Sequence, residues 1–170
     1  MRQSGWSAAL LIGLVAAAPA HADIADDCDG VRRVAQWTIF AGYGPDVTPE
    51  QVVETAPAID GANIFDNLVW SDERIHDLIR QIVASDFKID RSEAGLRYAG
   101  LYGEFFRLQC VAEAKRNIRF KKLPEAKPAI EECIKTSAKS RSSFELCLLD
   151  TTVVEDSWKD YTDPKKESSD

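Results

Sequence analysis

The residue types that carry most enzyme chemistry are scarce in this chain of 170 residues. If residues 1–22 are removed, as argued below, His76 is the only histidine, so any Ser–His or Cys–His nucleophile must use it. His76 lies at the edge of an apolar helical face, with Asp72, Glu73 and Arg80 at helical spacing. We interpret it as a surface histidine beside a carboxylate. No Gly-x-Ser-x-Gly motif is present, and the sequence therefore predicts no nucleophilic catalytic site.

An acidic cluster, formed by Asp26, Asp27 and Asp29, resembles part of a calcium-binding loop. The resemblance fails at the first and last ligand positions, which fall on Ala25 and Gln36. We interpret the cluster as negative charge at the N-terminus of a helix, where the helix dipole favours it. The sequence therefore predicts no metal site and no cofactor.

Residues 42–45 (Gly-Tyr-Gly-Pro) contain two glycines but lack the Gly-Lys-Ser/Thr of a phosphate-binding loop. We interpret them as a helix stop followed by a turn. Tyrosine is favoured at protein interfaces, and Tyr43 has Asp46 beside it in this loop. Together with Asp60 and Asp66 of the same acidic part of the chain, they are our candidate contacts to a partner.

One basic run stands out, with an aromatic residue inside it. We interpret it as positive charge near a helix C-terminus, where the helix dipole favours cations. Binding to an anionic partner or a membrane surface is the alternative. The run consists of Lys115, Arg116, Arg119, Phe120, Lys121 and Lys122.

Charge is distributed unevenly along the chain. Residues 23–90 hold 5 basic and 14 acidic residues, residues 91–141 hold 12 and 6, and residues 142–170 hold 3 and 8. The resulting net charge of −8 after residue 22 disfavours a dedicated nucleic-acid-binding protein. One interpretation is that these charges lie on solvated helix faces and that the acidic and basic faces partly neutralise one another. The other is that an acidic surface, built mainly from the first part, attracts a basic partner.

The first residues have the pattern of a secretory signal peptide. Arg2 supplies the positive start, residues 8–18 are apolar, and Ala-His-Ala at 20–22 supplies the cleavage site. We therefore expect the bacterial periplasm or the exterior, with no membrane span after cleavage; an uncleaved anchor is the alternative. The expected organisation is a signal peptide (1–22), one helical domain (23–161) and a flexible polar tail (162–170).

Four cysteines lie in the part expected to be exported, and none forms a Cys-x-x-Cys motif. An even number in an exported chain favours two disulfides over zinc ligands or free reactive thiols. Cys133 and Cys147 bracket a predicted turn between two antiparallel helices, which places them at matching heights. We therefore predict a Cys133–Cys147 bridge and, by elimination, a Cys28–Cys110 bridge.

Helical periodicity runs through nearly the whole chain, and it predicts one all-α bundle of five or six helices. Residues 63–70 are ambiguous, although Ile64, Phe65, Leu68 and Val69 fit one or two helical turns. The first expected helix runs from 24 to about 42, and the second from 49 to about 56 behind a Thr48–Gln51 capping box. A third helix is capped by Ser71, and a central fourth helix starts near 90–92. Pro128 opens the fifth helix, and the last one runs from a Ser142–Glu145 capping box to Tyr161.

Because no catalytic set emerges, we expect a non-catalytic module that binds another protein, such as an inhibitor of a basic periplasmic enzyme. Small exported helical immunity proteins, which neutralise cell-wall amidase toxins, have a similar general profile, although no motif is shared. Two alternatives remain. One is an assembly or structural factor of the envelope, and the other is a carboxylate-dependent cell-wall hydrolase.

Overall fold

The computed structural model describes residues 24–59, 61–66, 68–116 and 118–154. Over these ranges the chain forms six helices and one hairpin of two very short strands, so the predicted all-α fold is confirmed. The predicted signal peptide and tail lie outside the described residues. In chain order the elements are α1 (Ile24–Ala41), α2 (Pro49–Glu54), β1 (Ala58–Ile59), β2 (Ala62–Asn63), α3 (Asp72–Ala84), α4 (Glu93–Arg116), α5 (Leu123–Ser137) and α6 (Arg141–Thr152).

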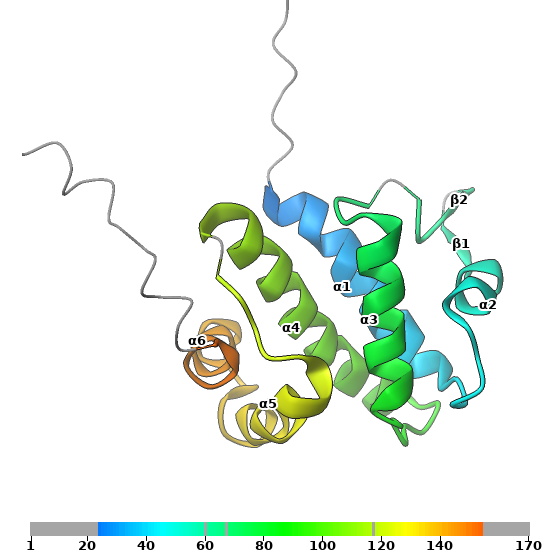
Figure 1. Cartoon of the computed structure of the whole chain (residues 1–170). Coiled ribbons are helices and arrows are strands. Elements are labelled where there is room, and N and C mark those ends of the chain that lie inside the picture. Colours follow the sequence, from blue (N-terminus) through cyan, green and yellow to red (C-terminus); the bar gives the residue numbers. More distant parts are fainter. Residues whose placement is uncertain (1–23, 60, 67, 117, 155–170) are drawn as a thin grey trace, which may run out of the picture.

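Helices α1, α3 and α4 form the centre of the bundle (Figure 1). Helices α5 and α6 make a hairpin on one side of them, and α2 with the two strands covers the other side. The sequence of α4 carries two apolar stripes, and both are largely buried because this helix packs against α1, α5 and α6. One stripe consists of Leu101, Phe105, Leu108 and Ala112, and the other of Ala99, Gly103, Phe106 and Cys110. The largest fully buried side chains are Tyr102, Phe105, Phe106, Phe144, Ile39, Leu78, Ile79, Leu123, Ile130 and Leu148.

The predicted disulfides are both present. Cys28 of α1 is bonded to Cys110 of α4 with Cα atoms 5.7 Å apart, and Cys133 of α5 is bonded to Cys147 of α6 with Cα atoms 5.8 Å apart. The first bridge joins the two helices with the most extensive contact, and the second closes the terminal hairpin. Among the helices that the structure describes, none combines the length and hydropathy of a membrane span.

The close approach of α1 and α4 depends on glycine. A Cβ atom at Gly103 would lie 2.8 Å from the backbone oxygen of Arg32, which cannot move without displacing α1. At Gly100, one turn earlier, the nearest atom is the side-chain nitrogen of Gln36 at 3.2 Å, and a flexible side chain can adjust. Gly100 and Gly103 both lower the helix propensity of α4, but only Gly103 is required for the close approach of α1.

We expect Gly103→Ala to lower the free energy of unfolding by about 2 kcal/mol, because forced separation of the helices outweighs the gain in helix propensity. Gly100→Ala is the matched control on the same helix, and it should stay within about 0.5 kcal/mol of the parent protein. Urea unfolding followed by circular dichroism measures both. Equal effects of the two substitutions would contradict close packing at Gly103.

Two helix starts follow the predicted capping chemistry. Thr48 and Gln51 form the capping box of α2, and the Ser71 hydroxyl accepts a hydrogen bond from the N–H of Arg74 in α3. Between them, residues 64–66 and 68–70 form turns and bends rather than the helical turns that the sequence allowed. Asn63 explains this locally, because its side chain accepts from the N–H of Phe65 and donates to the carbonyl of Val53.

Three predicted boundaries near the C-terminus are wrong. Helix α5 begins at Leu123 instead of Pro128, because Leu123 is buried and its N–H is capped by the side-chain oxygen of Gln81. Helix α6 is capped by Ser140 instead of Ser142. It also ends at Thr152, well before Tyr161. There the chain turns extended at Val153, which forms a β-bridge with Phe120.

Arginine and glutamate side chains connect α1, α4 and α6. Arg107 of α4 donates hydrogen bonds to Glu104 (Nε–Oε2, 2.7 Å) and to Glu145 of α6. Arg32 of α1 lies 3.8 Å from Glu104 and donates to Asp29 at 2.6 Å. The hydrogen bond from Arg32 and the surrounding guanidinium charges hold the pKa of Asp29 below its usual value. The contact between Arg107 and Glu145 thus joins the basic middle of the chain to the acidic segment that follows it.

Candidate functional site

A pocket of about 350 Å³ lies where α2, the irregular segment that follows the β1–β2 hairpin and the start of α3 meet. The capping box fixes the start of α2, Ser71 fixes the start of α3, and the turn at Asn63 fixes the segment between them. The pocket is therefore built by local hydrogen bonds on either side of a short irregular segment. Its lining residues are Val53, Phe65, Asp66, Leu68, Trp70, Asp72, Ile75 and His76.

The lining combines apolar side chains with titratable ones. Ile75 is buried in the hydrophobic core. The half-buried side chains of Phe65, Leu68 and Trp70 pack against this core. Asp66 and Asp72 are exposed at the same pocket. The result is an apolar surface bordered by carboxylates, an arrangement that suits a ligand with an apolar stem and a positive end.

His76 pairs with a residue that sequence spacing did not reveal. Its Nδ1 lies 3.5 Å from the Oε1 of Glu50 on α2. The backbone N–H of Glu50 and the hydroxyl of Thr48 hold the pKa of Glu50 below its usual value, with a smaller contribution from His76. The predicted carboxylate neighbour Asp72 lines the same pocket, one turn away on α3. His76 is thus a surface histidine beside carboxylates, as expected, but the carboxylate of Glu50 that contacts its ring comes from another helix.

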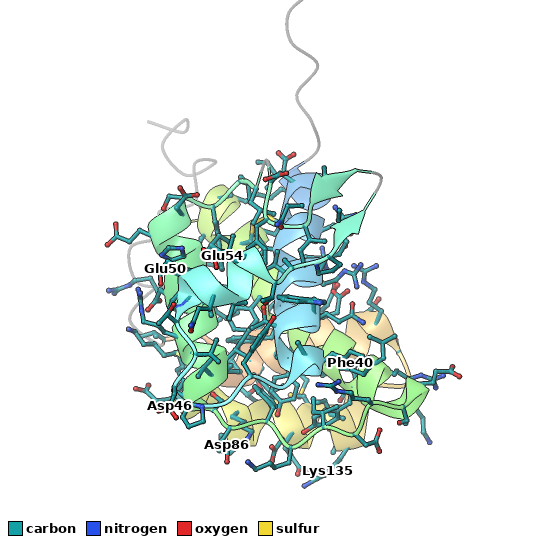
Figure 2. All side chains as sticks on the ribbon, turned by 90° about the vertical axis from the view of Figure 1, so that its right-hand side faces the viewer. Phe40, Asp46, Glu50, Glu54, Asp86 and Lys135 are labelled. Atoms are coloured by element: carbon teal, nitrogen blue, oxygen red, sulfur yellow. A yellow bond between two sulfur atoms is a disulfide. The ribbon has the colours of Figure 1, made fainter. Side chains whose placement is uncertain are left out.

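The surface around the pocket is acidic. The stretch from Asp46 to Asp77 carries eight acidic residues and a single basic one, Arg74. Within the described ranges Asp46, Glu54 and Asp72 are exposed and form no ion pair. Figure 2 shows Glu50 and Glu54 together on α2, on the same face as Asp46. We call this surface, comprising Asp46, Glu50, Glu54, Asp66, Asp72 and Glu73, the acidic face.

The candidate partner contacts lie in different environments. Tyr43 is half-buried: its hydroxyl lies 2.7 Å from the hydroxyl of Thr55, and its ring packs edge-on against Trp37 at 5.5 Å. Asp46 is exposed in the loop before α2, and Asp66 borders the pocket, where its carboxylate accepts from the N–H of Asn63. Asp60 lies outside the described residues.

Aromatic contacts connect the loop with the pocket. The ring of Trp37 meets both Tyr43 and, at 6.1 Å, Phe65 of the pocket lining. Phe65 and Trp70 are site residues that the sequence does not predict, because they lie in the one segment whose periodicity is ambiguous. The signal that could have found them is the density of aromatic and acidic residues between two helix caps.

In the described ranges no group of three or more His, Cys, Asp or Glu side chains is arranged to hold a metal ion. The chain matches no protein-family model, no curated protein and no solved structure. Its function is therefore argued from the chemistry of the acidic face and the pocket.

Proposed function

We propose that this protein is an exported, non-catalytic binding module that recognises a basic protein through the acidic face. A periplasmic cell-wall hydrolase, inhibited by this contact, is the partner we favour. The observation that carries the proposal is a pocket of about 350 Å³ lined by both apolar and acidic side chains. It is set in a surface where Asp46, Glu54 and Asp72 form no ion pair in the described part of the chain.

Two physical properties of this surface support binding to a basic partner. Clustered carboxylates produce a negative potential that accelerates association with a positively charged protein and makes it sensitive to salt. Half-buried Phe65 and Trp70 supply the rigid apolar contact area that interfaces favour, and Val69 between Leu68 and Trp70 is 48% exposed. A lysine or arginine can place its methylene groups on such a surface while its charge meets the rim.

Two disulfides are typical of proteins from oxidising compartments, which agrees with the export predicted from residues 1–22. Within such a compartment we place the protein in the bacterial periplasm or outside the cell. A wall hydrolase that acts on an anionic polymer needs a positive substrate-binding surface, and that surface is the one an acidic inhibitor can cover.

In the test, a periplasmic extract hydrolyses peptidoglycan, and the purified protein is added to measure how strongly it inhibits this hydrolysis. The wild-type protein should inhibit hydrolysis at low salt and lose inhibition at high salt. The triple variant Asp46→Asn, Glu54→Gln, Asp72→Asn should inhibit at least about tenfold less strongly, because it removes the steering charges. As a matched control, Glu93→Gln, Glu125→Gln, Asp150→Asn removes the same charge from α4, α5 and α6 and should inhibit like the wild type.

Other outcomes would replace the proposal. If the purified protein itself degrades peptidoglycan and loses this activity on Asp66→Asn or Asp72→Asn, it is the carboxylate-dependent hydrolase of the alternative interpretation. If it purifies in a stable, salt-resistant complex and inhibits nothing, it is an envelope assembly factor. Equal loss of inhibition in both triple variants would show that net charge, and not the acidic face, is responsible.

A further inference from the structure

A second pocket, of about 410 Å³, lies on the basic side of the molecule between α3, α4 and the segment 118–122. Its chemistry differs from that of the first, because three cationic side chains and two carboxamides border it. Its lining residues are Arg74, Gln81, Gln109, Glu113, Arg119, Phe120 and Lys122. The proposed function uses none of them.

The guanidinium of Arg74 is held in place from two sides. It lies over the ring of Trp70 at 4.7 Å, and it donates to Glu113 at 2.7 Å. Glu113 is itself held by the side chain of Gln109, which donates to the same oxygen at 3.0 Å. Arg74 is therefore positioned before any ligand arrives, which lowers the entropy that binding must overcome.

The other two cations are less committed. Arg119 is exposed and forms no ion pair within the described ranges. Lys122 lies 3.9 Å from Asp77, at the limit of an ion pair. Its neighbour Leu123 donates its N–H to the side-chain oxygen of Gln81, so the N-terminus of α5 is already capped. The guanidinium of Arg119 and the ammonium of Lys122 can thus turn toward a ligand without breaking a short contact.

The backbone fixes where Arg119 points. The segment is extended, so its side chains alternate between the core and the surface. Ile118 and Phe120 are buried, whereas Arg119 and Lys121 are exposed. The N–H of Lys121 donates to the carbonyl of Thr152, and this bond anchors the segment to the end of α6.

Burial of Phe120 argues against a membrane surface as the partner of the basic run. A segment that inserts into a membrane surface presents its aromatic and aliphatic side chains to the lipid. Here Phe120 is 7% exposed and packs against Phe105 at 6.0 Å. What remains outside is charge, which favours an anion taken from water.

The ligand must offer more than a carboxylate, because Arg74 and Lys122 already contact the carboxylates of Glu113 and Asp77. A further carboxylate adds one charge and two oxygens. A phosphate group carries up to two charges and at least three acceptor oxygens, and guanidinium groups bind it in bidentate geometry. From this geometry we propose that the second pocket binds the phosphate group of a soluble ligand, held by Arg74, Arg119 and Lys122.

The test is a titration of the full exported chain with pyrophosphate at constant ionic strength. The chemical shifts of the backbone amides, measured by NMR, report binding. Saturable shifts are expected at residues 74–81 and 118–123. The double variant Arg119→Gln, Lys122→Gln should bind at least about tenfold more weakly, because it removes two charge-assisted contacts. The matched control Lys139→Gln, Arg91→Gln removes the same charge from exposed positions elsewhere and should bind like the wild type. The melting temperature of each variant reports whether it still folds.

Three results would overturn the proposal. The first is the absence of saturable shifts in the wild-type protein. The second is equal binding of citrate, which would show a site for any polyanion. The third is binding to phosphatidylglycerol vesicles without binding to pyrophosphate, which would assign the basic run to a membrane surface. Loss of pyrophosphate binding in the Arg119 and Lys122 variant alone, at an unchanged melting temperature, supports the proposal. None of these results bears on the acidic face.

Discussion

Replacing Cys28 and Cys110 together by alanine is expected to lower the free energy of unfolding by about 4.5 kcal/mol. The bridge spans 82 residues of sequence, so removing it frees a long loop in the unfolded chain. Both sulfur atoms belong to side chains buried in the core, between the two helices with the most extensive contact. A loss of this size is a large part of the stability of an ordinary domain, which is about 5–15 kcal/mol.

The second disulfide supplies the matched comparison. Cys133 and Cys147 are separated by only 14 residues, and their double replacement by alanine should cost about 3 kcal/mol. Both variants lose the same atoms, and they differ in loop length and in the burial of Cys147, which is half-buried where the other three cysteines are buried. Urea unfolding under oxidising conditions measures both. A short-bridge variant that is less stable than the long-bridge variant would contradict the entropic explanation.

Sequence analysis predicted the bridges and the central helix because the relevant signals are local or periodic. Two apolar stripes side by side on α4 require neighbours on several sides, and α1, α5 and α6 are those neighbours. Cys133 and Cys147 bracket the turn between α5 and α6, so their pairing follows from the hairpin. The capping chemistry of Thr48 and Ser71 likewise involves residues only three apart.

The errors arise where a distant residue overrides a local signal. Pro128 suits a helix start, but Gln81, 42 residues before Leu123, caps an earlier turn of α5. The apolar residues up to Tyr161 suggest a longer last helix, but pairing of Val153 with Phe120 ends it. The pocket escaped prediction for the same reason. It requires α2 to face α3, and no spacing rule connects His76 with Glu50.

A second large loss is expected when Arg107 is replaced by methionine. Its side chain is only 10% exposed and contacts both Glu104 and Glu145, whose side chains are 18% and 27% exposed. Methionine has a similar length but carries no charge. The negative charges of the two carboxylates would then be less neutralised at a site that water reaches poorly. Removing one partner of such a group costs about 3 kcal/mol. The melting temperature should fall by roughly 10 °C in a domain of this size.

Arg141 provides a control that shares the same carboxylates. It contacts Glu104 at 3.4 Å and Glu145 at 3.1 Å, but its side chain is 65% exposed, so water screens both pairs. Arg141→Met should therefore cost less than about 1 kcal/mol. The two variants change charge and side-chain type identically, so burial is what distinguishes them. If they were equally destabilised in thermal unfolding, the attachment of α6 to α4 would rest on apolar packing, and the two carboxylates would contribute nothing to it.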